Sequence, residues 1–266
     1  MPTQDIAVVL EFPVSRRKFF FSGKRNVFVP MYDNEWGSYW QWKRIAWSGM
    51  GVISFCGAVT RHARRCGVRN ILELKYFPPL EGLPREAGDP KRVFLWERGD
   101  ISRRIAETLF PPSEGYVFDV KGAKEFLPRE EYLQRLAKCG IVIAPRRKEG
   151  IGMAFLETMA MGKCVVAHND ATMNEYIEDG INGILFDARN PKPISAEMVA
   201  AVCKRFSSVE SAADLLHQRW LAGAEKINGF VTDQPCCCPS LLNRLKLAVS
   251  YPLYLLEGVF YRVRQL

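Results

Sequence analysis

Several kinds of segment are missing from this sequence of 266 residues. It contains no uninterrupted run of about 18 apolar residues, so we predict no membrane-spanning helix. Residues 1–5 show no basic region followed by an apolar core, and we therefore expect no secretory signal. No internal repeat or low-complexity tract is evident either. The sequence is that of an ordinary globular protein, because 48% of its residues are hydrophobic and 25% are charged.

Patterns that bind metals are also scarce. The eight cysteines include no Cys-x-x-Cys pair and no histidine partner at zinc spacing. Cys236, Cys237 and Cys238 are adjacent, which is poor geometry for three ligands of one tetrahedral metal. The three histidines are scattered along the chain. We therefore predict free thiols in a reducing cytoplasm, with no bound metal and no cofactor.

Basic residues exceed acidic ones, and the excess is local. The chain carries 37 Lys and Arg against 29 Asp and Glu, a formal charge of +8. Residues 1–80 hold 12 basic and 5 acidic side chains, whereas residues 81–190 are close to neutral, with 16 and 18. This distribution indicates a surface turned toward an anionic partner. Phosphorylated substrates, an anionic membrane leaflet and nucleic acid are all candidates at this point.

Short apolar runs alternate with helical patterns along most of the chain. Within residues 92–187, runs such as 141–144 and 164–168 are typical of buried strands, and segments with helical periodicity separate them. This alternation predicts a parallel sheet covered on both faces, the doubly wound α/β type. Residues 1–80 repeat the pattern in shortened form. Four prolines and two glycines in residues 78–92 predict a linker between two lobes.

The C-terminal region has its own pattern. In residues 240–266, apolar side chains recur at helical spacing, and four basic side chains outnumber Glu257. This predicts an amphipathic helix, for which a contact with an anionic membrane and packing across two lobes are alternatives. The predicted organisation is then an N-terminal α/β lobe (1–80), a linker (81–91), a second α/β lobe (92–230) and a C-terminal tail (231–266).

The turn between the strand at 141–144 and the next helix carries the most chemical information. Gly150 and Gly152 lie in this turn, where missing side chains let a ligand approach the backbone. The first-turn amides and the helix dipole then favour a phosphate. Glu149 lies in the turn and Glu157 inside the helix, so two carboxylates flank that position and suit sugar hydroxyls. On spacing alone, a solvated loop carboxylate and a helix-surface residue are an equally good interpretation.

A wider frame resembles a known family. From Glu149 the sequence follows the pattern Glu-Gly-Ile-Gly-x-x-x-x-Glu-x-Met-Ala-x-Gly-Lys-x-Val-Val-Ala. This pattern resembles the Glu-x7-Glu signature of the retaining group-1 (family-4) glycosyltransferases, and the resemblance continues over residues 174–187. It is strong over residues 140–187, moderate over 92–140 and weak before residue 80. These enzymes have two Rossmann-like lobes of the GT-B type, so the resemblance implies that fold, with a shortened N-terminal lobe.

The resemblance also implies roles by position. Glu149 is the implied catalytic residue, in contact with the donor sugar. The amides around Gly150, Ile151 and Gly152 are implied to lie near the sugar and the diphosphate, and Glu157 to hold the ribose hydroxyls. The implied reaction moves a sugar, with retention and without a metal, from a nucleotide-diphosphate sugar to a glycan or lipid-linked acceptor.

The family usually places an Arg and a Lys after the first strand of the second lobe. Arg98 fits the Arg position and is the fifth predicted donor-binding contact. No Lys follows at the usual place. Arg103 and Arg104 are candidate substitutes, although an exposed helix face is the favoured interpretation of both.

Two other functions stay open beside the enzyme. One is a non-catalytic, nucleotide-sugar-binding partner of another glycosyltransferase, and the other is a nucleotide-sugar epimerase on the same fold. A nucleic-acid partner is not expected, because the basic residues lie mostly in a lobe with another explanation and no base-stacking element accompanies them. We expect a cytoplasmic location, and a peripheral contact with the inner face of an anionic membrane stays open.

Overall fold

The computed structural model describes residues 6–10, 25–33, 39–204, 206–233 and 238–263. The chain divides into two compact units. Unit 1 combines Met1–Lys75 with Leu221–Leu266, and unit 2 is Tyr76–Trp220. The residues predicted as a linker, 81–91, belong to unit 2. The chain passes between the two units after Lys75 and after Trp220.

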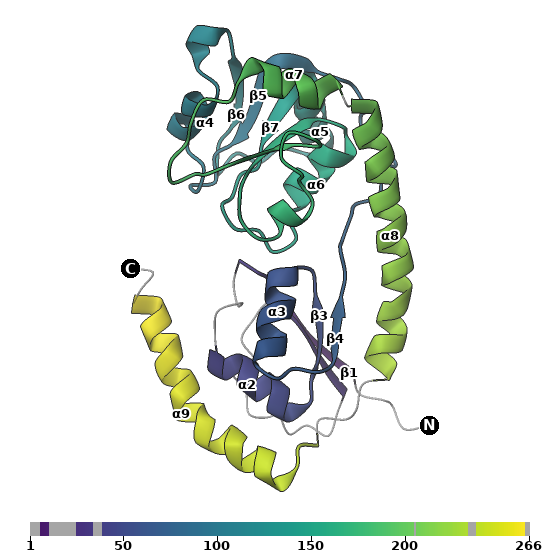
Figure 1. Cartoon of the computed structure of the whole chain (residues 1–266), viewed down its shortest axis with the longest axis vertical. Coiled ribbons are helices and arrows are strands. Elements are labelled where there is room, and N and C mark those ends of the chain that lie inside the picture. Colours follow the sequence, from purple (N-terminus) through teal and green to yellow (C-terminus); the bar gives the residue numbers. More distant parts are fainter. Residues whose placement is uncertain (1–5, 11–24, 34–38, 205, 234–237, 264–266) are drawn as a thin grey trace. The chain divides into compact units, whose positions relative to one another are not determined.

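Unit 1 contains a parallel sheet of four strands in the order β1-β2-β3-β4. Figure 1 shows this sheet with the helices of the same unit. Its elements are β1 (Ile6–Leu10), β2 (Arg25–Val29), α2 (Tyr39–Ser48), β3 (Gly51–Ser54), α3 (Gly57–Arg65), β4 (Ile71–Glu73) and α9 (Leu241–Val263). In the register of these strands, Val27 pairs with Gly51, and Val52 pairs with Ile71. The order of the described strands in the sheet is thus their order in the sequence.

The helix α2 supplies much of the core of unit 1. Trp42 and Ile45 are fully buried, and their spacing of three residues places them on one face of the helix. The ring of Trp42 meets the ring of Phe28 edge to face, with the centroids 5.9 Å apart. All four residues of β3 are buried. Unit 1 therefore has a hydrophobic core of its own, as an independent layer of sheet and helix requires.

Unit 2 contains a parallel sheet of five strands in the order β6-β5-β7-β8-β9. Its elements are β5 (Asp89–Trp96), α4 (Arg103–Leu109), η1 (Pro112–Glu114), β6 (Val117–Lys121), α5 (Arg129–Lys138), β7 (Cys139–Ile143), α6 (Met153–Ala160), β8 (Cys164–His168), η2 (Met173–Glu175), β9 (Ile184–Phe186) and α7 (Ala196–Lys204). The long helix α8 (Phe206–Thr232) follows α7.

The strand β5 shows how both faces of this sheet are covered. Side chains alternate between the two faces along a strand. Val93 and Leu95 pack in one cluster with Leu109 of α4, and α7 contributes to the same cluster. Phe94 packs in a second cluster with Leu156 of α6, to which α5 contributes as well. The doubly wound α/β arrangement expected for this segment is confirmed.

Two parallel sheets with helical crossovers confirm the predicted pair of Rossmann-like lobes. The sequence predicts a short helix over residues 174–178, and the structure has the short 3-10 helix η2 (Met173–Glu175) there. The amide of Tyr176 donates to the carbonyl of Met173, three residues back. The side-chain amide of Asn182 then donates to the carbonyl of Tyr176 at 2.9 Å. This carbonyl is bonded outside the helix, so the helical ladder ends there.

Two further features of the described residues are the state of their cysteines and the apolarity of their helices. All six cysteines in the described ranges, among them the buried Cys139 and Cys164, are free thiols. Cys236 and Cys237 lie outside the described residues. A search of the described helices finds none that combines the length and the apolarity needed to cross a bilayer.

Candidate functional site

The strand order of unit 2 marks one edge of its sheet. The chain leaves β5 toward β6 on one side, whereas β7 lies on the other side of β5. Open α/β sheets bind ligands outside the carboxyl ends of the strands, where the strand order reverses in this way. The loops that begin at this point are residues 97–102, after β5, and residues 144–152, after β7. The sheet of unit 1 has no such reversal among its described strands.

The two loops at the reversal are joined by a hydrogen bond. Nε of Arg147 donates to the carbonyl oxygen of Asp100 at 3.2 Å. The loop of Arg98 and the loop of Glu149 are therefore brought together by the fold, although the two bonded residues lie 47 positions apart in the sequence. This proximity is what the donor-site prediction requires.

The turn into α6 depends on a glycine. Gly152 has φ +81° and ψ +46°, the left-handed conformation. A Cβ atom on this residue would lie 1.9 Å from Cε1 and 2.5 Å from Cδ1 of the buried Phe155, closer than real Cβ contacts. The N-cap residue of α6 is Gly152 itself, which has no side chain that could cap the first amides. The amides at a helix N-terminus favour an anion, and the binding of one here stays a prediction.

Glu149 lies in this turn and is 8% exposed. Its Oε2 lies 3.9 Å from Nη1 of Arg146, an ion pair within the loop. The alternative of a solvated loop carboxylate does not describe Glu149, because water reaches little of the residue. A carboxylate held close to a helix N-terminus is also favoured by the helix dipole.

Glu157 is buried as well, with 4% of its surface exposed. Nη1 of Arg129, the first residue of α5, donates to Oε1 of Glu157 at 2.8 Å. Burial raises the pKa values of the Tyr76 and Tyr132 phenols, and the negative charge of Glu157 raises them further. The carboxylate therefore lies near two phenol rings and one arginine. It is not the helix-surface residue that spacing alone allowed.

Arg98 is exposed at the end of β5, and its guanidinium lies over the ring of Trp96, 4.8 Å from the centroid. Nζ of Lys121, at the end of β6, lies 4.1 Å from the centroid of the same ring. Burial lowers the pKa of Lys121, and the nearby charge of Arg98 contributes to the lowering. Two cations thus share one indole at the carboxyl edge of the sheet.

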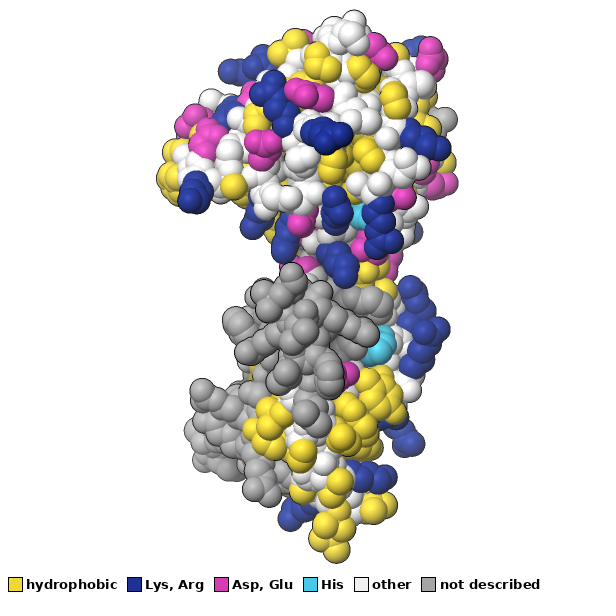
Figure 2. Space-filling model, turned by 90° about the vertical axis from the view of Figure 1, so that its left-hand side faces the viewer, with side chains coloured by type: hydrophobic (Ala, Val, Ile, Leu, Met, Phe, Trp, Pro, Cys, Tyr) yellow, Lys and Arg dark blue, Asp and Glu magenta, His cyan; other side chains and the backbone are white. Residues whose placement is uncertain are grey.

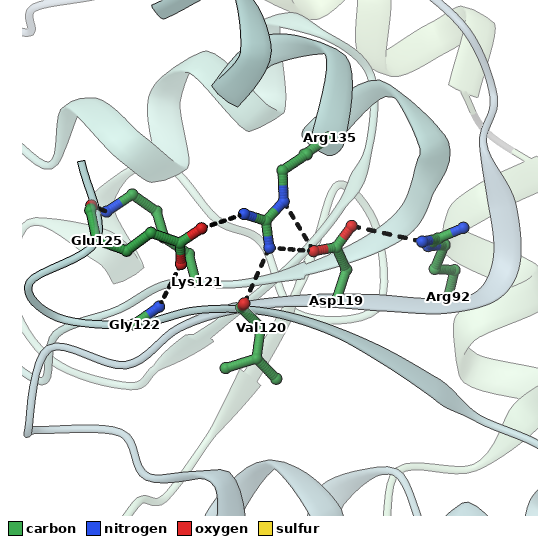
Figure 3. A network of polar contacts seen from close by, with 7 residues as sticks. All are labelled: Arg92, Asp119, Val120, Lys121, Gly122, Glu125 and Arg135. Atoms are coloured by element: carbon green, nitrogen blue, oxygen red, sulfur yellow. Dashed lines mark hydrogen bonds and ion pairs between the residues drawn. The ribbon is translucent and has the colours of Figure 1, made fainter. Parts of the chain in front are cut away.

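A polar network fixes the loop after β6, as Figure 3 shows. Nε of Arg135 donates to Oδ1 of Asp119 at 2.9 Å, and Nη1 donates to Oε1 of Glu125 at 2.9 Å. Oε2 of Glu125 accepts the amide of Gly122 at 2.8 Å, and the Glu125 carbonyl accepts Nζ of Lys121 at 2.6 Å. Residues 121–125 are therefore tied to one another and to Arg135 of α5.

The charges in this network support one another. Burial on its own would lower the pKa of Arg135. The hydrogen bonds and the negative charges of Asp119 and Glu125 outweigh this effect, and the pKa of Arg135 is raised. The Gly122 amide and Arg135 lower the pKa of Glu125. Asp119 also lies 3.5 Å from a guanidinium nitrogen of Arg92. A fixed loop holds the start of α5, and with it Arg129, in a constant position relative to α6.

The two arginines considered as substitutes for the missing lysine are on α4. Arg103 is exposed and its Nε donates to Oε1 of Glu107 at 2.8 Å. Arg104 is exposed too. This fits the interpretation of an exposed helix face. The cation that the fold places beside Arg98 is Lys121, which sequence reasoning missed.

Two residues near α6 have structural roles. Nζ of Lys163 is buried and donates to the carbonyl of Ala137 at 2.6 Å and to the carbonyl of Glu86. The hydroxyl of Tyr176 donates to the carbonyl of Tyr76 at 2.9 Å. Both side chains join segments of unit 2 that are distant in the sequence. They support the site from behind and do not form part of it.

Comparison with known proteins gives a family for part of this unit. Residues 123–207 match the family model described as Glycosyl transferases group 1. The chain is 31% identical over 104 residues to an uncharacterized glycosyltransferase of Methanocaldococcus jannaschii, covering 39% of this chain and 28% of the relative. It is 27% identical over 178 residues to the alpha-maltose-1-phosphate synthase of Mycolicibacterium smegmatis, covering 66% and 42%. The chain therefore spans less than half the length of these relatives.

Solved structures are similar to this chain over a larger part of its length. TarM of S. aureus, a mutant in complex with Fondaparinux, alpha-GlcNAc-glycerol and UDP, is 15% identical, with a TM-score of 0.55 over 79% of this chain and 51% of TarM. HepE of Anabaena, in complex with UDP, is 14% identical, with a TM-score of 0.54 over 81% of this chain and 74% of HepE. The fold is that of the GT-B glycosyltransferases, and the family match supports a group-1 glycosyltransferase.

Proposed function

We propose that this chain transfers a sugar, with retention of anomeric configuration, from a nucleoside diphosphate sugar to a glycan or lipid-linked acceptor in polysaccharide or glycoconjugate synthesis. The observation that carries the proposal is the burial of both Glu149 and Glu157, in the glycine turn before α6 and on α6 itself, at the reversal of the strand order. Two buried carboxylates beside an anion site suit a ligand that has hydroxyls on both sides of a diphosphate.

The diphosphate is the part of the donor that needs positive charge. When the bond between the sugar C1 and the phosphate oxygen breaks, its electron pair stays on the departing diphosphate. The amides around Gly150, Ile151 and Gly152 and the guanidinium of Arg98 supply dipoles and charge for it. Lys121 reinforces Arg98 through their common contact with Trp96. We propose that these groups act without a metal ion.

The two carboxylates then contact different parts of the donor. Glu157 accepts hydrogen bonds from the ribose hydroxyls, and a carboxylate has enough lone pairs to hold Arg129 at the same time. Glu149 contacts the sugar. The acceptor hydroxyl forms the new bond to C1, and its proton passes to the departing diphosphate. Arg129 is a positioning residue, because it acts on the donor through Glu157.

Thermal unfolding in the presence of nucleotides tests the donor site. UDP, GDP, ADP and dTDP, and their glucose conjugates, are added to the full chain at increasing concentration. A ligand at 100 times its Kd stabilises the folded state by about 2.7 kcal/mol, which is about 5–10 °C in Tm for a unit of this size. Glu157→Gln is expected to lose most of this shift. Glu131→Gln, an exposed carboxylate on α5, is the matched control and keeps it.

Turnover is measured separately. With the stabilising donor, Glu149→Gln is expected to keep nucleotide binding and to lose transfer to acceptors from glycan and lipid extracts. NMR of the anomeric proton in the product reads out retention. If none of the nucleotides raises Tm, the donor site is wrong. Binding without transfer to any extract indicates the non-catalytic partner, and turnover without acceptor indicates the epimerase.

A further inference from the structure

The C-terminal helix α9 packs on α2 of the same unit through polar groups. Nη1 of the buried Arg44 donates to the carbonyl of Leu247 at 2.5 Å and to Oγ of Ser250 at 3.1 Å. The rings of Tyr251 and Tyr254 lie 5.3 and 5.9 Å from the same guanidinium. The side of α9 that faces the unit is therefore held by one arginine and its partners.

The single acidic residue of α9 belongs to that contact. Glu257 accepts the amide of Tyr39 at 2.8 Å through Oε1 and the amide of Trp40 at 3.0 Å through Oε2. These are the first two amides of α2, so Glu257 caps the N-terminus of α2. Its negative charge is directed into the unit and not toward the opposite side of α9.

The opposite side of α9 is apolar and exposed. Leu245 and Val249, one turn apart, are 57% and 71% exposed. Other large apolar side chains of the same helix are exposed with them, namely Leu241, Leu242, Leu253 and Leu255. Figure 2 shows hydrophobic side chains gathered on this unit with lysine and arginine side chains beside them. The described part of α9 buries only Leu247 and Ser250.

This polarity is the reverse of that of an ordinary surface helix. A helix on a globular unit normally buries its apolar stripe and exposes its charged side. Here the side that faces α2 carries Leu247, Ser250 and Glu257, and the other leucines of the described part of α9 face outward. Exposed apolar surface of this kind marks a contact with another phase or another molecule. Within unit 1, the packing of α9 on α2 leaves these leucines uncovered.

Basic residues line the exposed apolar stripe. Arg244 and Lys246 precede and follow Leu245, so they lie about 100° to either side of it on the helix. Both are exposed, and Nζ of Lys246 lies 5.9 Å from the ring centroid of Trp47 on α2. Cations at the margins of an apolar stripe reach lipid headgroups while the stripe enters the acyl boundary. No described acidic side chain of α9 opposes them.

We propose that α9 is a membrane-docking helix, whose apolar stripe enters the surface of an anionic lipid bilayer with Arg244 and Lys246 on the headgroups. This inference stands independently of glycosyl transfer. A symmetric pairing of two copies through the same stripe is disfavoured, because it would place the basic margins of both copies together. The bilayer supplies the negative charge that a second copy lacks.

Vesicle flotation tests the proposal with the full chain. The vesicles contain either phosphatidylcholine alone or phosphatidylcholine with 30% phosphatidylglycerol. Binding is expected to the anionic vesicles and to weaken as salt is raised, because the headgroup contribution is screened. Replacing Arg244 and Lys246 by Gln is expected to weaken binding about fivefold for each charge.

The decisive variant is the double change Leu245→Glu and Val249→Glu, which is expected to abolish flotation. Its matched control makes the same change on α8, at the exposed Leu215 and Leu221, and carries the same added charge. The control is expected to float as the wild type does, and circular dichroism checks that all variants fold. Equal loss in both double variants would overturn the proposal, since net charge would then explain binding.

Two other results would also overturn it. One is wild-type protein that fails to float with anionic vesicles. The other is a dimer in analytical ultracentrifugation that the Leu245→Glu and Val249→Glu variant dissociates, without any binding to vesicles; a second copy would then cover the stripe. The Tm shifts that nucleotides cause are measured in a separate assay. A negative flotation result would therefore not contradict the donor site.

Discussion

Replacing Gly152 with alanine is expected to destabilise the turn that leads from β7 into α6. Two costs add at this position. A left-handed backbone costs a residue with a Cβ about 1–2 kcal/mol. The added methyl would lie 1.9 Å from Cε1 of Phe155, and overpacking of a core costs about 1–3 kcal/mol. The sum is about 2–5 kcal/mol in the free energy of unfolding.

A second glycine separates the two costs. Gly115 has φ +85°, and a Cβ there would meet nothing within 4 Å. Gly115→Ala thus carries the backbone cost alone, about 1–2 kcal/mol. The two variants are compared by thermal unfolding, at about 2–4 °C in Tm for each kcal/mol. Gly152→Ala is expected to lower Tm further than Gly115→Ala and to abolish the Tm shift caused by the donor nucleotide, since the moved turn carries the anion site.

The clash itself can be relieved. Leucine lacks the Cε1 atom, so Phe155→Leu is expected to recover part of the loss when it is combined with Gly152→Ala. In a double-mutant cycle the two changes should therefore couple favourably, by about 1–3 kcal/mol. If Gly152→Ala were no less stable than Gly115→Ala, or if the cycle showed no coupling, the close contact with Phe155 would not be the reason for a glycine here.

Two further predictions concern the scaffold. Arg44→Met should remove the bonds to Leu247 and Ser250 and lower the free energy of unfolding by about 2–4 kcal/mol. Limited proteolysis should then cleave α9 from the rest of the chain. Unchanged protection of α9 from the protease would contradict its attachment through this arginine. Glu125 has a lowered pKa, so it stabilises the fold above its ordinary value of 4.5, and this contribution is lost as pH falls through the folded-state value. Acid unfolding of Glu125→Gln should therefore fall less steeply below pH 4.5 than that of wild type, whereas Glu131→Gln should follow wild type.

The course of the chain was largely readable from periodicity. Runs such as 141–144 and 164–167 are apolar throughout because both faces of their sheet are covered, and a strand buried on two sides has few polar positions. The short helix expected at 174–178 is present as the 3-10 helix η2, Met173–Glu175. The bond from the side chain of Asn182 to the Tyr176 carbonyl follows it, and nothing in the local pattern announces such a bond.

The points where the chain passes between units were harder to predict. Residues 78–92 have the composition of a linker, yet they belong to unit 2. The buried Lys163 donates to the carbonyl of Glu86, and Phe77 lies in the core cluster of the sheet. A stretch rich in proline and glycine can pack as well as any other when its carbonyls find donors.

The sequence by itself determined the fold class and the stretch that carries the chemistry. Both are local: strand and helix periods are written in consecutive side chains, and Glu149, Gly152 and Glu157 lie within one turn and helix. Only the tertiary structure decided what surrounds these residues. The partners Arg129 and Lys121 are brought to the edge by α5 and β6, whose positions follow from strand order and not from spacing. The same holds for α9, because a helical pattern shows that two sides differ, and only packing decides which side faces water.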